Sequence, residues 1–135
     1  MILIDSDVLL DVALRQEPFF RESATFLLEA ERSPEPACIA WHSVSNVYYV
    51  ARRRDPDADA RGFILSLLEW AAISPTSTES VRYAASLPMD DFEDALQVAA
   101  AEACGARHIV TRNLRDYERS PIRAIGPQEA LGEAH

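Results

Sequence analysis

Short apolar segments separated by helical patterns constrain the fold of this chain more than any other feature of its sequence. Each segment is too short for a helix, and residues that form turns lie close to several of them. Between the segments, apolar residues recur at the i, i+3, i+4 and i+7 spacing of amphipathic helices. The expected strands are Ile2–Ile4, Ala37–Ala40, Ala71–Ile73, Arg107–Thr111 and Ile122–Ile125. The expected helices are Phe19–Glu31, Ser43–Arg54, Phe63–Trp70 and Asp91–Ala103.

Strands that alternate with helices predict a parallel sheet covered by helices on both faces. Right-handed connections in such a sheet bring the carboxyl ends of all strands to one edge, where ligand sites lie. A length of 135 residues fits one domain. We expect a single α/β domain over residues 1–130, a three-layer α/β/α sandwich with a mostly parallel five-stranded sheet. Residues 131–135 are expected to form a flexible tail.

The basic residues are all arginine, since the 13 Lys and Arg residues include no lysine. This composition excludes a catalytic lysine, and with it a P-loop. The net charge of −9 argues against broad, nonspecific coating of nucleic acid. It leaves room for a local basic rim around an acidic pocket.

The apolar runs and the cysteines indicate the environment of the chain. No run reaches the roughly 18 apolar residues of a membrane span, and the first apolar stretch lacks the basic lead of a signal peptide. We therefore expect a soluble, cytoplasmic protein with no membrane partner. Cys38 and Cys104 lie in apolar surroundings without CxxC spacing, so buried free thiols are expected rather than a disulfide or a zinc site.

Carboxylates from distant parts of the sequence are expected to meet at the carboxyl edge of this sheet. Asp5 ends the first strand. Asp91 and Asp94 open the helix before the fourth strand and share one helix face. Asn113 and Asp116 follow the fourth strand. Clustered carboxylates repel one another unless a cation lies among them, and such oxygen ligands suit Mg²⁺ or Mn²⁺. The sequence therefore predicts a metal site that promotes cleavage of a phosphodiester bond.

Helix capping is the alternative explanation of these acidic residues. Asp and Ser residues after a strand commonly cap the next helix, so Ser6 or Asp7 would cap one helix and Asp90 or Asp91 another. Capping does not require Asp94, which lies a turn inside its helix and faces the same edge as Asp5. The convergence of these two residues favours the metal site.

Three segments carry a resemblance to a known family: LIDSDVLLD, HSVSNVYYVARR and DDFEDALQVAAAEACGARHIVTRNLRDY. They resemble PIN-domain proteins, and more narrowly the VapC-like toxins of bacterial toxin–antitoxin pairs. The resemblance extends from Met1 to about Ile125, and the third segment carries its most specific motif. It implies a Rossmann-like α/β/α fold and a metal-dependent endoribonuclease that uses Mg²⁺ or Mn²⁺.

The resemblance also implies roles for individual residues. Asp5 and Asp94 match acidic metal ligands of the family and are the first catalytic candidates, with Asp91 as an assisting group. A further family position falls on Asn113 or Asp116. The strand geometry favours Asn113 and the charge favours Asp116, so both remain metal-ligand candidates, and Asp116 is also a catalytic candidate.

Asn46 is a departure from the family pattern. The family commonly carries a Glu in the helix after the second strand, and Asn46 stands at the matching position. A neutral amide can accept a hydrogen bond from a bound water or ligate weakly, but it supplies no negative charge. Asn46 stays among the catalytic candidates, while a catalytically weak PIN-like binding module stays open as an alternative function.

Arginine residues near the acidic edge are the candidate RNA contacts. Arg112 and Arg115 lie beside the predicted site, and Arg53 ends the helix that carries Asn46. Arg binds phosphate bidentately, although Arg53 also suits the C-terminus of its helix without any RNA. The resemblance implies a small antitoxin protein as a partner and, with the surplus of apolar residues, a homodimer.

Two other α/β proteins are alternatives. In a haloacid-dehalogenase-like phosphatase, Asp5 would be the nucleophile and Asp7 the general acid. The absence of lysine and the short chain count against this enzyme. A response-regulator receiver domain, which is a signalling module, would need an Asp after the third strand and a lysine after the fifth. The chain has neither, since the third expected strand ends at Ser74-Pro75.

Overall fold

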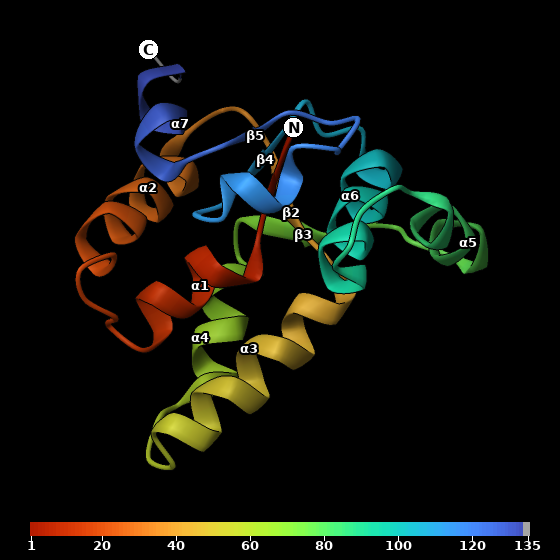
Figure 1. The fold of residues 1–135 in the computed structure, drawn as a ribbon. Helices are drawn as coiled ribbons and strands as arrows, with labels where there is room; N and C mark the ends of the chain where they lie inside the picture. Colours follow the sequence, from red (N-terminus) through yellow and green to blue (C-terminus); the bar gives the residue numbers. More distant parts are fainter. Residues whose placement is uncertain (134–135) are drawn as a thin grey trace.

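A five-stranded sheet forms the centre of the molecule, and all paired strands run parallel. The computed structural model describes residues 1–133. The strand order is β3-β2-β1-β4-β5 (Figure 1), so the direction of winding reverses between β1 and β4. The strands are β1 (Ile2–Ile4), β2 (Ala37–Ile39), β3 (Ala71–Ile73), β4 (His108–Val110) and β5 (Ala124–Ile125). Ligands bind at such a reversal, at the carboxyl ends of the strands.

Helices cover both faces of the sheet. They are α1 (Ser6–Ala13), α2 (Phe20–Arg32), α3 (Trp41–Arg54), α4 (Ala60–Leu67), α5 (Thr78–Ser86), α6 (Phe92–Cys104) and α7 (Pro127–Glu133), with a 3₁₀ turn η1 (Leu114–Tyr117). Among the helices of residues 1–133, none has the length and apolar character needed to cross a bilayer.

The alternation of side chains along the strands creates two separate cores. Ile2 and Ile4 of β1 pack with α1, α2, α3, α4 and α7, whereas Leu3 points to the opposite face and packs with α6. Figure 1 shows α5 and α6 on one side of the sheet and α1, α2 and α7 on the other. The three-layer α/β/α sandwich with a parallel five-stranded sheet is therefore confirmed.

Helix α6 carries the acidic motif and is sharply bounded. The Asp91 side chain caps its start by accepting a hydrogen bond of 3.0 Å from the Asp94 backbone N–H. Its alanine-rich interior favours the helical state and packs closely against the sheet. Gly105 ends it in the left-handed conformation at φ 72°, which glycine adopts without strain. The cap fixes the first turn of α6 at the carboxyl edge.

The sequence prediction missed four elements: α1, α5, η1 and α7. Helix α1 follows β1 after one residue and is only eight residues long, and the polar residues Asp5, Ser6 and Asp7 at its start read as a turn after the strand. Helix α5 begins with a capping box between Ser77 and Ser80, and only Ala84 within it is buried. Short elements with so few buried residues give a weak periodic signal.

The prediction of free thiols at Cys38 and Cys104 is wrong, because the two residues form a disulfide. Cys38 points from β2 to the sheet face on which α6 packs, and Cys104 is the last residue of α6. The packing of α6 on β2 thus brings together sulfurs that are 66 residues apart in sequence. No local spacing reveals a pair of this kind.

The C-terminal segment is partly helical. Helix α7 includes residues 131–133 of the expected flexible tail, and residues 134 and 135 lie outside the described part of the chain. The domain division at residue 130 remains a prediction.

Candidate metal centre

Asp5 lies at the carboxyl end of β1 and is almost fully buried, with 3% of its surface exposed. Its backbone N–H donates to the Val110 carbonyl oxygen at 3.0 Å, which joins the end of β1 to that of β4. Its Oδ1 accepts from the Ser6 backbone N–H at 2.6 Å as the cap of α1. Its Oδ2 accepts from the Thr111 hydroxyl at 2.9 Å and the Tyr117 hydroxyl at 2.8 Å. The carboxylate is therefore held in one orientation.

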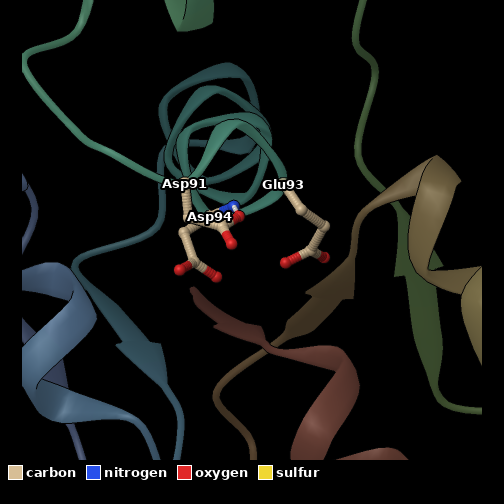
Figure 2. Close-up of side chains that lie close together, drawn as sticks. All are labelled: Asp91, Glu93 and Asp94. Atoms are coloured by element: carbon tan, nitrogen blue, oxygen red, sulfur yellow. Dashed lines mark hydrogen bonds between the residues drawn. The ribbon is translucent and has the colours of Figure 1, made fainter.

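The start of α6 places three further carboxylates together. Asp91, Glu93 and Asp94 each offer an oxygen, and these oxygens lie within 4.8 Å of one another. Figure 2 shows the three side chains extending from the first turn of α6 toward the red segment in which β1 passes into α1. Asp91 is a helix cap, as the capping alternative supposed, but Asp94 caps nothing and is buried. Capping alone leaves Asp94 unexplained.

Asp5 and Asp94 meet at one hydroxyl group. The Tyr117 hydroxyl lies 2.8 Å from Asp5 Oδ2 and 3.4 Å from Asp94 Oδ1. Their side chains come from β1 and α6, near opposite ends of the sequence, yet face the same point. The expected convergence of these two residues at the carboxyl edge is present in the structure.

The acidic side chains raise one another's pKa values. Burial, followed by the charges of Asp7 and Glu93, raises the pKa of Asp5 to about 7. Burial, a hydrogen bond to Glu93 and the charges of Asp91 and Asp5 raise the pKa of Asp94 to about 8. Within residues 1–133, neither Asp5 nor Asp94 forms an ion pair, so burial and the neighbouring carboxylates dominate both pKa values. An all-oxygen, electronegative donor set of this kind fits a divalent cation such as Mg²⁺ or Mn²⁺.

Glu93 is a site residue that the sequence analysis missed. Its Oε1 accepts hydrogen bonds from His42 Nε2 at 3.1 Å, Asn46 Nδ2 at 3.2 Å and Gln97 Nε2 at 3.0 Å. Burial opposes the charged form of Glu93, but the bonds from His42 and Gln97 outweigh it and lower its pKa. The i, i+4 spacing of Glu93 and Gln97 was the available signal, because it puts both on one helix face.

Asn46 contacts the acidic cluster through Glu93. It projects from the first half of α3, and its amide is one of the three donors to Glu93 Oε1. The negative charge that Asn46 cannot supply is therefore present one hydrogen bond away, on α6 instead of α3. The neighbouring Gln97, which is fully buried, also donates to Ser6 and Ser43, so this network ties α1, α3 and α6 together.

Asn113 and Asp116 lie in the exposed segment after β4, and their roles as metal ligands remain predictions. Both are exposed, and within residues 1–133 neither forms a hydrogen bond with Asp5 or Asp94. Asn113 starts η1, and its backbone N–H donates to the Thr111 hydroxyl. Asp116 shares a hollow of about 340 Å³ with residues of the acidic edge. The lining residues are Met89, Asp90, Asp91, Arg115, Asp116, Glu118 and Arg119.

The candidate RNA-binding arginines differ in their surroundings. Arg112 forms a bidentate ion pair with the fully buried Asp11, at 2.6 Å from Nε and 2.9 Å from Nη2. Its guanidinium also stacks on the Phe19 ring, 3.9 Å from the centroid. Arg115 is exposed in the hollow beside Asp91. Arg53 is exposed in the last turn of α3. The contacts of Arg112 give it a structural role, and RNA binding by all three arginines remains a prediction.

Comparisons with known proteins identify the family. Residues 1–115 match the family described as PIN domain. A search of the curated proteins returns no match.

Solved structures with the same fold include several VapC proteins. VapBC2 from Rickettsia felis, bound to a DNA fragment from its promoter, is 14% identical with a TM-score of 0.67, over 93% of this chain and 98% of that chain. Mycobacterium tuberculosis VapC20, a toxin that cleaves the sarcin–ricin loop, is 11% identical with a TM-score of 0.67, over 81% and 87%.

DNA-bound VapBC from Salmonella typhimurium is 20% identical with a TM-score of 0.59, over 93% of this chain and 97% of that chain. At these identities the likeness is one of fold. The match to the family, in contrast, spans most of the sequence and includes Asp5, Glu93 and Asp94. The chain therefore belongs to the PIN domain family.

Proposed function

We propose that this PIN domain is a metal-dependent endoribonuclease and the toxin of a toxin–antitoxin pair. The observation that carries the proposal is the convergence of Asp5 and Asp94 on one hydroxyl at the reversal point of the sheet, with Asp91 and Glu93 beside them. The fold is shared with a ribonuclease toxin among the similar structures, which supports the reaction class.

Asp5, Asp94, Asp91 and Glu93 would hold Mg²⁺ or Mn²⁺. Bound there, the cation would supply an activated water and offset negative charge on the phosphodiester. The protein's own part is to hold the buried carboxylate of Asp5 in a fixed orientation, through the hydroxyls of Thr111 and Tyr117. Asp116 lines the hollow that also contains Asp91, so it would lie beside a substrate bound there.

Basic residues around the acidic edge would bind the RNA backbone. Arg115 and Arg119 line the hollow next to Asp91, where a phosphate would lie close to the carboxylates. Arg53 lies two helical turns from Asn46 and so on the same side of α3, about 10 Å along its axis. These arginines would contact phosphates locally although the net charge of the chain is −9.

The phosphatase alternative receives little support from the geometry. As a nucleophile, Asp5 would have to give up its hydrogen bonds with Ser6, Thr111 and Tyr117 to attack a substrate, whereas a metal ligand would act in the orientation that these bonds fix. Asp7, the general acid of that alternative, is mostly buried, and its Oδ2 accepts a hydrogen bond of 3.0 Å from the Arg112 backbone N–H.

An apolar groove between α3 and α4 supports a protein partner. Trp41, Tyr49 and Leu65 expose between 62% and 71% of their surfaces beside a hollow of about 420 Å³. Two of the similar structures are of VapBC bound to DNA, so a segment of a small antitoxin is the occupant that we propose. The homodimer of the free protein remains a prediction.

Cleavage assays test the nuclease proposal. Purified protein is incubated with structured and unstructured RNAs in Mn²⁺, in Mg²⁺ and in chelator, with a phosphomonoester assay in parallel. Metal-dependent RNA cleavage supports the proposal. Phosphomonoester hydrolysis alone favours the phosphatase, and RNA binding without cleavage favours the catalytically weak binding module.

The partner proposal is tested by reading the genes on either side of this one and co-expressing any small DNA-binding protein that they encode. A stable complex that is lost on Leu65→Glu supports the groove as the antitoxin site. A neighbouring gene that encodes no small DNA-binding protein would weaken the toxin–antitoxin assignment, while leaving the nuclease assignment intact.

A further inference from the structure

Tyr117 is the buried residue of an otherwise exposed turn. It ends η1, where Leu114, Arg115 and Asp116 are all exposed, yet only 4% of its own surface is accessible. Its ring packs in the core between the sheet and α6, together with Leu3 of β1 and Val98 of α6. This packing carries the hydroxyl group to the carboxyl edge of the sheet.

The hydroxyl of Tyr117 lies between the two central carboxylates. It is 2.8 Å from Asp5 Oδ2 and 3.4 Å from Asp94 Oδ1. A phenol carries one hydrogen, so the shorter contact is the hydrogen bond that it donates, and this bond goes to Asp5. Asp94 faces the same oxygen at a longer distance. The hydroxyl oxygen therefore lies between Asp5 Oδ2 and Asp94 Oδ1 and keeps these two oxygens apart.

A second hydroxyl, that of Thr111, also donates a hydrogen bond to Asp5. Thr111 lies at the other end of the same short segment and donates to the same Oδ2 atom at 2.9 Å. The two donors approach from different elements, one at the end of β4 and one at the end of η1. Together with the Ser6 backbone N–H on Oδ1, they leave Asp5 a single side-chain orientation.

We propose that Tyr117 is a positioning residue of the metal centre, whose hydroxyl fixes the orientation of Asp5 and its separation from Asp94. Held in this way, the carboxylates of Asp5 and Asp94 would both be available as ligands of the cation. Hydrogen-bond partners of this outer kind commonly set metal affinity by holding the ligands in place. The inference rests on the proposed metal-dependent function and adds a residue that acts through the ligands.

The test is Mn²⁺ binding by Tyr117→Phe, which keeps the ring in the core and removes the hydroxyl. Mn²⁺ is titrated against wild type and variant, and the free ion is measured by electron paramagnetic resonance. We expect the Kd to rise about 10–100-fold in the variant. The matched control is Tyr83→Phe, which removes a hydroxyl from another partly buried tyrosine of the same core and is expected to leave the Kd unchanged.

The outcomes separate this inference from the proposed function. If the wild type does not bind Mn²⁺, the metal-dependent function and the role of Tyr117 both fail. If wild type and Tyr117→Phe bind Mn²⁺ equally, only the role of Tyr117 is refuted. The titrations are run well below the melting temperature of each variant, with circular dichroism as a check, so that a loss of stability does not imitate a loss of affinity.

Discussion

The side-chain amide of Asn46 donates a hydrogen bond of 3.2 Å to the carboxylate of Glu93. This contact joins α3 to the first turn of α6 at the edge of the acidic cluster. His42 and Gln97 donate to the same oxygen of Glu93, so three donors hold one carboxylate. Asn46, which replaces the Glu common in the family, therefore contacts a carboxylate on α6. Whether the site has its full negative charge then depends on Glu93.

Glu93→Gln tests whether this carboxylate contributes to the site. The substitution keeps the size of the side chain and removes its charge, so we expect cleavage and Mn²⁺ affinity to fall about 10–100-fold. Glu102→Gln is the matched control, because Glu102 is an exposed residue near the far end of the same helix. Equal activity of the two variants would show that Glu93 is not part of the metal centre.

Asn46→Asp tests whether an added carboxylate next to Glu93 lies within reach of the metal. A second carboxylate within hydrogen-bond distance of Glu93 would repel it in the metal-free protein, so we expect a lower melting temperature at neutral pH. Mn²⁺ is expected to restore much of this loss, because the cation would bind the added charge. Thermal unfolding with and without Mn²⁺ measures both effects. A loss of stability that Mn²⁺ does not reverse would place Asn46 outside the reach of the metal.

The raised pKa values of Asp5 and Asp94 predict how the metal-free protein responds to pH. Both rise from 3.8, to about 7 and about 8, so between about pH 4 and pH 8 the folded state binds more protons than the unfolded state. The free energy of unfolding should therefore fall as the pH rises through this window. Chemical denaturation at several pH values measures the slope, and Asp94→Asn is expected to flatten it. An equally steep slope in the variant would contradict the assigned cause.

We expect Arg112→Ala to lower the stability of the fold and Arg115→Ala to weaken RNA binding. Arg112→Ala leaves the buried Asp11 without its charged partner, which should cost about 3 kcal/mol of folding free energy. Arg115→Ala removes an exposed side chain, so it should weaken RNA binding with little change in stability. Denaturation curves and RNA-binding titrations on both variants measure the contrast. A stable Arg112→Ala with impaired RNA binding would restore Arg112 as an RNA contact.

The sequence was sufficient for the architecture of the sheet and for its acidic edge. Strand segments such as Ile2–Ile4 are fully buried, so their apolar runs mark them clearly, and a parallel sheet fixes where Asp5 must lie. The position of Asp94 followed from helical periodicity in α6. These inferences depend on local patterns, which a single sequence contains.

Contacts between residues far apart in the chain could not be predicted from the sequence. The ion pair between Arg112 and the buried Asp11 joins the segment after β4 to α1, and no spacing in the sequence indicates it. The disulfide and the contact of Asn46 with Glu93 likewise depend on how α6 packs on β2 and α3. Their geometry is decided by tertiary packing, which residue type and periodicity do not determine.

The most direct test of the central claim is RNA cleavage by wild type, Asp5→Asn and Asp94→Asn, with Mn²⁺ and with chelator, on proteins shown to be folded by circular dichroism. The account predicts cleavage by the wild type in Mn²⁺, none in chelator and none by either variant. Cleavage that persists in a folded Asp5→Asn or Asp94→Asn variant, or that survives complete removal of divalent metal, would contradict it.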